Sequence, residues 1–283
     1  MNRRQFISTT AALAGATIST TCNRAMEAER GVRRIDRLGI QLYTVRDRMH
    51  DDVPGTLGDM AAIGYDEVEF AGYYGYAASD IRSMLTAEGL SSPSAHIDLL
   101  DLTDSLPQVL DAATAIGHDY IILPWLADNE RMTLDDYRLL ADQCNTIGEQ
   151  CQRAGLQFAY HHHDFELAIV DGERPLDILL GSVDAALMKL EIDFFWCVKA
   201  GIDPLDLMQR YQGRVKLCHV KDMDSEGQMV NPGEGTIDFA LLFAASSKAG
   251  IEHFFVEHDE PADPLSTAEI GFDHVTGLTY TEQ

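Results

Sequence analysis

Short apolar runs alternate with amphipathic segments along most of this chain. A recurring phrase consists of a helical segment, a glycine and a short apolar run, and it is centred on Gly64, Gly89, Gly117, Gly155 and Gly250. Glycine suits the left-handed backbone that ends a helix, and a short apolar run bounded by turn residues is typical of a buried strand. The pattern therefore predicts helix–strand units with parallel strands and right-handed crossovers.

The number of these units predicts one closed barrel. Adding the run 38–43 and the strands that end at Asp193 and His219 gives roughly eight strands, the number in a (β/α)8 TIM barrel. We expect this single α/β domain over residues 35–283. A doubly wound open sheet is the alternative, but the chain has no GxGxxG fingerprint to support it. Residues 224–238 are expected to form a long loop after the seventh strand.

Residues 1–28 are predicted to be an export signal and leader. Arg3-Arg4 before Phe6-Ile7 resembles a twin-arginine signal, and the apolar run 11–18 is too short and too rich in threonine to span a bilayer. We therefore expect export to the periplasm. A lipid anchor at Cys22 stays open, although Ser19-Thr20-Thr21 is a poor lipobox.

Composition excludes some partners. Apolar residues make up 46% of the chain and charged residues 24%, as in globular proteins. The formal net charge of −25 would repel a phosphate backbone, so nucleic acid is excluded as a partner. No integral membrane span is expected, and the sequence leaves homo-oligomerisation open. Cys197 and Cys218 are expected in strands, and no CxxC spacing indicates a thiolate site.

Polar, metal-compatible residues stand at the ends of four apolar runs in the C-terminal half: His161, Asp193, His219 and Glu257. In a parallel barrel these ends converge on one mouth, where active sites lie. Period-two alternation pairs His161 with His163, Glu191 with Asp193, His219 with Lys221, and Glu257 with Asp259, each pair on one strand face. A mixed imidazole and carboxylate set favours manganese, zinc, iron or cobalt over magnesium or calcium.

The motifs around these residues resemble a known superfamily. Tyr160-His161-His162-His163-Asp164-Phe165-Glu166 is similar to the Tyr-His-Asn-His-x-Phe-Glu pattern of xylose isomerase-like barrels, the sugar phosphate isomerase/epimerase family. Leu190-Glu191-Ile192-Asp193 with Trp196, and His219-Val220-Lys221-Asp222, are similar as well, so the resemblance runs from about Leu38 to Glu260.

The resemblance implies a metal set of His161, Asp193, His219 and Glu257, with Glu257 also acting as a base. At His161 the chain departs from ketose epimerases, which place a glutamate there, so a symmetric two-glutamate epimerisation is not expected. Lys221, Glu166 or His163 would then supply the second group. Trp196 stands where similar epimerases carry a histidine.

Substrate contacts are expected from Glu69, His96, His163 and Trp196. Gln41, Tyr43 and Trp125 would form a stacking wall for a sugar ring. His50, His118, His253 and His274 are expected at the surface.

Together these features predict a metal-dependent sugar or keto-sugar isomerase or epimerase that abstracts a proton next to a carbonyl. A lyase or hydratase acting on 3-keto-glycosides at the same site, and a non-catalytic carbohydrate-binding barrel, are the alternatives. The apurinic endonuclease branch of this fold is disfavoured by the charge.

Overall fold

Eight parallel strands close into a barrel in the computed structural model, which describes residues 31–282. Their order around the barrel is β11-β2-β3-β4-β5-β6-β7-β8, so each strand lies beside its neighbour in the chain and the last pairs with the first. The barrel strands are β2 (Gly39–Gln41), β3 (Glu67–Ala71), β4 (Ser91–His96), β5 (Tyr120–Leu123), β6 (Gln157–His161), β7 (Met188–Asp193), β8 (Val215–Val220) and β11 (His253–Val256). The predicted (β/α)8 barrel is confirmed, and the open sheet is wrong.

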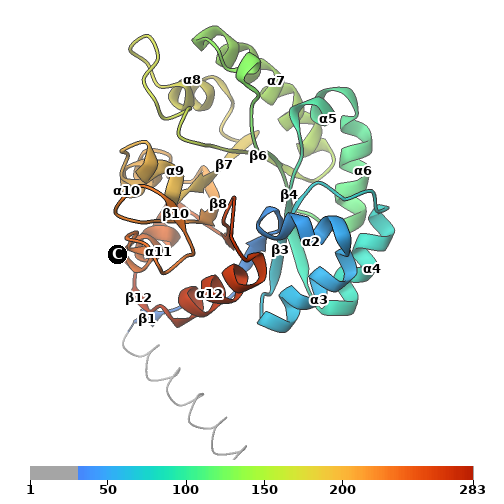
Figure 1. Cartoon of the computed structure of the whole chain (residues 1–283). Coiled ribbons are helices and arrows are strands. Elements are labelled where there is room, and N and C mark those ends of the chain that lie inside the picture. Colours follow the sequence, from blue (N-terminus) through green and yellow to red (C-terminus); the bar gives the residue numbers. More distant parts are fainter. Residues whose placement is uncertain (1–30, 283) are drawn as a thin grey trace, which may run out of the picture.

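Helices surround the strands (Figure 1). They are α2 (Arg46–Asp51), α3 (Val53–Ile63), α4 (Ala78–Glu88), α5 (Leu99–Asp104), α6 (Leu106–Ile116), α7 (Leu134–Arg153), α8 (Pro175–Ser182), α9 (Phe194–Lys199), α10 (Pro204–Arg210), α11 (Phe239–Ala249) and α12 (Pro264–Gly277), with short 3-10 helices η1 (Leu42–Val45) and η2 (Asp128–Glu130).

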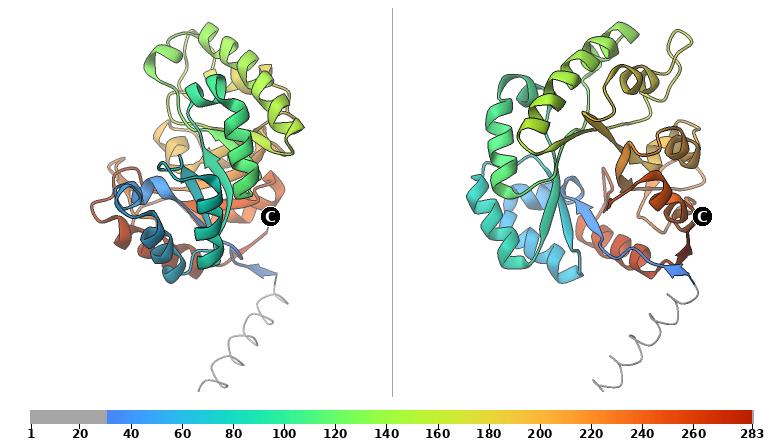
Figure 2. Two further views of the ribbon diagram at one scale, coloured as in Figure 1. Left: turned by 90° about the vertical axis from the view of Figure 1, so that its right-hand side faces the viewer. Right: turned by 180° about the vertical axis from the view of Figure 1, so that it is seen from behind.

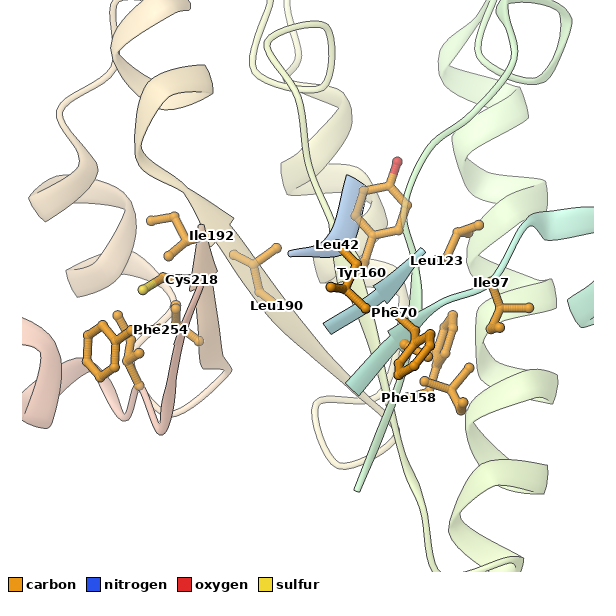
Figure 3. Packing of buried hydrophobic residues seen from close by; sticks show 14 of the residues in the cluster. Leu42, Phe70, Ile97, Leu123, Phe158, Tyr160, Leu190, Ile192, Cys218 and Phe254 are labelled. Carbon is orange, nitrogen blue, oxygen red and sulfur yellow. The ribbon is translucent and has the colours of Figure 1, made fainter. Parts of the chain in front are cut away.

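Helix α7 shows how the sequence sets these elements. Thr133 accepts a hydrogen bond from the Asp136 backbone N–H while the Asp136 side chain accepts one from the Thr133 N–H, a capping box that satisfies two N-terminal donors. The buried face then recurs at helical spacing and rests on the sheet, and the chain leaves the helix at Gly155 with φ +79°. Figure 3 shows the apolar layer between strands and helices, which includes Phe158, Leu190 and Cys218.

The barrel interior has an apolar layer at mid-height, made by Tyr120, Ile122, Ala159, Leu217 and Phe255. The Phe255 ring fills the space beside Gly39, where an added Cβ would lie 2.3 Å from Phe255 Cδ1. Any larger residue at Gly39 would therefore displace the ring. Replacing Phe255 with alanine would cost about 3–5 kcal/mol of stability, because the cavity could not collapse around it.

Two small antiparallel sheets lie outside the barrel. Strand β1 (Val32–Arg33) pairs with β12 (Tyr280–Thr281), which brings the first described strand beside the C-terminus (Figure 2). Strands β9 (Asp222–Met223) and β10 (Met229–Val230) form a hairpin, with β9 directly before the predicted loop 224–238 and β10 within it. The Asp222 carboxylate organises this loop by accepting backbone N–H groups of Met223, Gly233, Gly235 and Ile237.

Some local expectations are wrong. The first barrel strand ends at Gln41, so Tyr43 lies in η1 and not on a strand. Cys197 lies in helix α9, because the chain turns into a helix directly after Asp193. The predicted signal, residues 1–28, falls outside the described residues. Within residues 31–282, no helix is both long and apolar enough to cross a membrane.

Candidate active site and metal centre

Buried polar side chains fill the barrel interior above the apolar layer. They come from seven of the barrel strands and include Gln41, Glu69, His96, His161, Glu191, Asp193, His219 and Glu257. Apart from His96, whose side chain is 10% exposed, each of these residues is at most 4% exposed. Charges and imidazoles at this depth need partners or a bound cation, because burial without them is unfavourable.

Asp193, His219 and Glu257 form one group that could hold a metal ion, here called the outer group. His219 Nδ1 lies 2.5 Å from Glu257 Oε2 and 3.7 Å from Asp193 Oδ2. None of these three atoms makes a hydrogen bond, although all three are buried. Atoms that face one another without hydrogen-bond geometry are what a cation-binding cradle requires, so the residues present fit a divalent ion.

His96, His161, Glu191 and His219 form a second such group, called the inner group. Glu191 Oε2 is 2.8 Å from His96 Nε2, 3.3 Å from His219 Nε2 and 3.5 Å from His161 Nδ1. Burial opposes a charge on His96, but Glu69 and Glu191 outweigh it and raise the His96 pKa to about 9. A protonated His96 can therefore balance the negative charges of Glu69 and Glu191.

His161 and His219 lie between the two groups. His219 turns Nδ1 to the outer carboxylates and Nε2 to the inner ones. His161 is arranged similarly, with Nδ1 toward Glu191 and Nε2 4.0 Å from Asp193 Oδ2. The structure thus brings together the four residues of the predicted metal set, with His161 closer to the inner group than to Asp193.

Lys221 supplies a buried positive charge beside the outer group. Its Nζ lies 3.1 Å from Asp193 Oδ2, 2.8 Å from Glu257 Oε2 and 2.7 Å from Asp259 Oδ1. Burial alone would lower the Lys221 pKa, but Asp193, Asp259 and Glu257 raise it well above its ordinary value. Burial likewise opposes ionisation of Glu257, whereas His219 and Lys221 lower its pKa, so this carboxylate is ionised at neutral pH.

Glu166, expected as a catalytic group, is tied into the fold. Its Oε1 accepts a hydrogen bond from Tyr160 Oη at 2.5 Å, and its Oε2 accepts one from the His163 backbone N–H at 2.8 Å. Tyr160 lies on the outer face of β6, opposite to His161, because side chains alternate along a strand. Burial raises the Glu166 pKa to about 7.

His163 and Trp196 form part of the wall beside Lys221. Their ring centroids lie 5.3 Å apart, and Lys221 Nζ is 5.7 Å from the Trp196 ring. Both His163 Nδ1 and Trp196 Nε1 are buried without a hydrogen-bond partner. Burial lowers the His163 pKa to about 3, so its ring is neutral.

His162 ties the ends of two strands together on the other face of β6. Its Nε2 accepts a hydrogen bond from the Asp193 backbone N–H at 3.1 Å, and its Nδ1 contacts the His163 carbonyl oxygen at 3.1 Å. Because a backbone N–H can only donate, Nδ1 carries the ring proton. This contact fixes the backbone that carries Asp193.

The sequence interpretation left two features of the site unassigned or misplaced. Glu191 shares a strand face with Asp193, as alternation requires, but nothing local indicated its three imidazole neighbours. Gln41, expected in a stacking wall, lies inside the barrel and is fully buried. Tyr43 and Trp125 are exposed and remain available for a wall.

Comparison with known proteins places this geometry among related barrels. Residues 57–275 match the sequence model of the family described as xylose isomerase-like TIM barrel. An inosose dehydratase from Geobacillus kaustophilus is 23% identical over 82% of this chain and 92% of its own length.

Solved structures show the same architecture. A sugar phosphate isomerase/epimerase from Parabacteroides distasonis superposes with a TM-score of 0.72 and 25% identity, covering 84% of this chain and 92% of that one. The IOLI protein, solved with a bound zinc atom, superposes with a TM-score of 0.68 at 14% identity, over 85% of this chain and 98% of its own.

Proposed function

Because this chain belongs to the xylose isomerase-like TIM barrel family, we propose that it is a divalent-metal-dependent enzyme acting on a keto-sugar or keto-polyol. The reaction begins with removal of a proton from the carbon next to the carbonyl. It then eliminates water, as a dehydratase does. An isomerase or epimerase shares the first step and differs only in where the proton returns.

The observation that carries this proposal is the position of Glu257. Its buried Oε2 lies between His219 Nδ1 and Lys221 Nζ, at 2.5 and 2.8 Å, and makes no hydrogen bond. A carboxylate placed beside a cation-binding cradle and a buried ammonium group has the two components that enolate-forming chemistry requires: a base, and positive charge for the developing oxyanion.

Asp193, His219, Glu257 and His161 would hold the cation. When bound, a divalent ion supplies Lewis-acid polarisation of the substrate carbonyl. The imidazole and carboxylate donor set suits manganese, zinc, iron or cobalt better than magnesium. The zinc atom in the IOLI protein supports this assignment at the level of the shared fold.

Glu257 takes the proton from the carbon next to the carbonyl, and the electron pair of that C–H bond moves toward the carbonyl oxygen. The three carboxylates around Lys221 Nζ keep it positively charged, and this charge stabilises the negative charge that develops on the carbonyl oxygen. In elimination, the C–O bond to the neighbouring hydroxyl then breaks, and Glu257 returns its proton to the departing oxygen as water. One carboxyl group therefore suffices as base and acid.

Elimination is favoured over epimerisation by two observations. A relative that matches over most of both chains is an inosose dehydratase. Glu166, a candidate for a second acid–base group, has both oxygens engaged by Tyr160 and His163. His163 and Trp196 are left to contact substrate hydroxyls, with Tyr43 and Trp125 at the rim.

Exchange of substrate protons with deuterated water tests the proposal. Purified protein loaded with manganese, zinc or cobalt is incubated with a keto-inositol and with other keto-sugars. Mass spectrometry follows α-proton exchange, and ultraviolet absorbance follows the enone product. We expect exchange in the wild type and its loss in Glu257→Gln.

Glu252→Gln is the matched control, because Glu252 directly precedes β11 and pairs with Lys216 at the opposite end of this strand. Its exchange rate should equal that of the wild type. Exchange at the wild-type rate in Glu257→Gln would refute Glu257 as the base. Sugar binding without exchange for any substrate would favour a non-catalytic carbohydrate-binding barrel.

The periplasm is the proposed compartment. The support is sequence alone: Arg3-Arg4 before Phe6-Ile7, then an apolar run. Changing both arginines to lysine should keep the precursor in the cytoplasm, as measured by cell fractionation. An unchanged periplasmic yield would show that the pair has no targeting role.

A further inference from the structure

A chain of three buried side chains crosses the barrel behind the outer group. Gln41 on β2, Glu69 on β3 and His219 on β8 are each fully buried. Gln41 Nε2 donates to Glu69 Oε1 at 2.7 Å, and His219 Nε2 lies 2.8 Å from the same oxygen. Neither Gln41 nor Glu69 takes part in the chemistry proposed above, so their burial inside the barrel calls for another explanation.

A contact with the Tyr43 backbone, outside this set of three side chains, fixes the orientation of the Gln41 amide group. The Tyr43 backbone N–H, which can only donate, lies 3.0 Å from Gln41 Oε1. The amide oxygen must therefore face Tyr43, and the amide nitrogen must face Glu69. This removes the ambiguity between the two ends of the amide group.

Glu69 can consequently act only as an acceptor toward His219. Its Oε1 receives Gln41, and its Oε2 receives the Ser94 hydroxyl at 2.5 Å. Because both Glu69 oxygens already accept hydrogen bonds from these two donors, the carboxylate presents an acceptor to His219, and the hydrogen of this contact belongs to His219 Nε2.

This proton assignment determines what the other nitrogen of His219, Nδ1, can bind. With the hydrogen on Nε2, a neutral ring has its lone pair on Nδ1, the atom 2.5 Å from Glu257 Oε2 and 3.7 Å from Asp193 Oδ2. A lone pair facing two carboxylates is repulsive unless a cation lies between them. The same proton assignment prevents neutral His219 from giving its Nε2 to an ion in the inner group.

We infer that Gln41 and Glu69 are positioning residues that hold His219 in the Nε2–H tautomer and so direct one cation per chain into the outer group. The inference rests on the proposed function, because it concerns the ion of that site. In this inference Glu69 and Glu191 orient the metal-binding side chains, and no second ion occupies the inner group. Carboxylates that orient a metal-binding histidine typically contribute 10–100-fold to metal affinity.

Zinc affinity of the full chain, measured by competition with a chromophoric chelator, tests the inference. We expect one zinc per chain in the wild type. Glu69→Gln should bind zinc about 10–100-fold more weakly at unchanged stoichiometry, because a neutral amide oxygen is a weaker acceptor for the His219 Nε2–H than a carboxylate. Gln41→Leu, which leaves the carboxylate in place, should weaken binding by a smaller factor.

Glu67→Gln is the matched control. Glu67 is on the same strand, is 2% exposed, and also contacts an imidazole, His253 Nδ1, at 2.8 Å. The substitution removes the same charge from a carboxylate–imidazole pair that is also largely buried and lies away from the outer group. Its zinc affinity should equal that of the wild type, which separates a positioning role from a general loss of packing.

Nitrogen-15 NMR of the imidazole groups supplies a second readout. In the zinc-bound wild type, His219 should show its hydrogen on Nε2, and this signal should change in Glu69→Gln but not in Glu67→Gln. Wild-type zinc affinity in Glu69→Gln, or two zinc ions per wild-type chain, would overturn the inference and leave the proposed function intact. A wild-type chain that binds no divalent metal would overturn both.

Discussion

The two ends of the barrel use the same kinds of residue in opposite ways. At the N-terminal floor, Glu67 contacts His253 at 2.8 Å and Arg37 at 2.9 Å. Also at the floor, Glu252 accepts from Tyr120 Oη and pairs with Lys216. At the mouth, His161, Glu191, Asp193, His219 and Glu257 each have a buried polar atom with no hydrogen-bond partner.

This difference separates stability from function. None of the floor side chains just named has a buried polar atom without a partner. The mouth carries carboxylates and imidazoles from strands that also reach the floor, yet each of these side chains keeps a buried atom without a hydrogen-bond partner. Unpaired buried polar atoms are unfavourable unless a ligand satisfies them, so the mouth has the arrangement expected of a binding site.

The largest expected effect comes from the mouth. Asp193→Asn removes the charge of Oδ2 but keeps the Oδ1 acceptor for the Trp196 N–H at the start of α9. We expect zinc affinity to fall by at least about 100-fold and turnover to fall with it. Equilibrium dialysis with elemental analysis gives the affinity.

Asp203→Asn is the control for that substitution, because Asp203 caps α10 by accepting from the Leu205 N–H and lies outside both metal groups. It should bind zinc as the wild type does. Full zinc occupancy in Asp193→Asn would contradict the outer group as the cation site.

Glu166 sharpens the comparison, since it belongs to the mouth-side loop but is fully partnered, like the floor. Its folded pKa of about 7 lies above the ordinary value of 4.5. The native state therefore holds this proton more tightly than the unfolded chain, and the stabilisation is complete below about pH 4.5 and lost as pH rises through 7. Wild-type stability should lose up to about 3 kcal/mol from this group by pH 8.

Urea unfolding of the wild type and Glu166→Gln from pH 4.5 to 8 isolates this contribution, because the other titrating groups are common to both proteins. The stability difference between them should shift in favour of the variant as pH rises. A pH-independent difference would show that Glu166 has an ordinary pKa in the native state.

A substitution that weakens the contacts at the floor should lower stability without changing activity. Glu67→Gln weakens the contacts with Arg37 and His253, and we expect a loss of about 1–3 kcal/mol in the free energy of unfolding. Metal affinity and kcat should not change, since the apolar layer lies between floor and mouth. A drop in kcat without a drop in stability would contradict this separation.

The smallest effect is expected at the rim of the mouth. Trp125 is 49% exposed on the loop after β5, where its ring is available to stack on a sugar. Trp125→Ala should raise KM by roughly 3–10-fold, corresponding to about 0.5–1.5 kcal/mol, with stability unchanged. Leu139→Ala, at an exposed position of α7, is the control and should leave KM unaltered.

The sequence was sufficient for the strand ends but not for the contacts across the barrel. Alternation within one strand correctly placed Glu191 on the same face as Asp193. Its contacts with His96 and His219 depend on the register between strands, which shifts between Leu190 and Glu191. Such a shift has no signature in the local sequence.

Histidines show the same limit. His118 and His253 were expected at the surface; the expectation is wrong for His118, which is buried, and His253 is only partly exposed. His118 is 4% exposed and contacts the Ser92 carbonyl oxygen, whereas His253 on β11 contacts Glu67 on β3, with only β2 between the two strands. Partners that are 26 and 186 residues away in the chain can be recognised only once the barrel is closed.

The apolar layer of Tyr120, Ile122, Ala159, Leu217 and Phe255 separates the charged groups of the floor from those of the mouth. It excludes water and ions from the space between two sets of charged groups, so that each set is neutralised locally. Gly39 makes this apolar layer continuous, because the absence of a side chain there leaves room for the Phe255 ring. The mouth can therefore be given new ligands or new chemistry by substitution while the floor continues to hold the barrel closed.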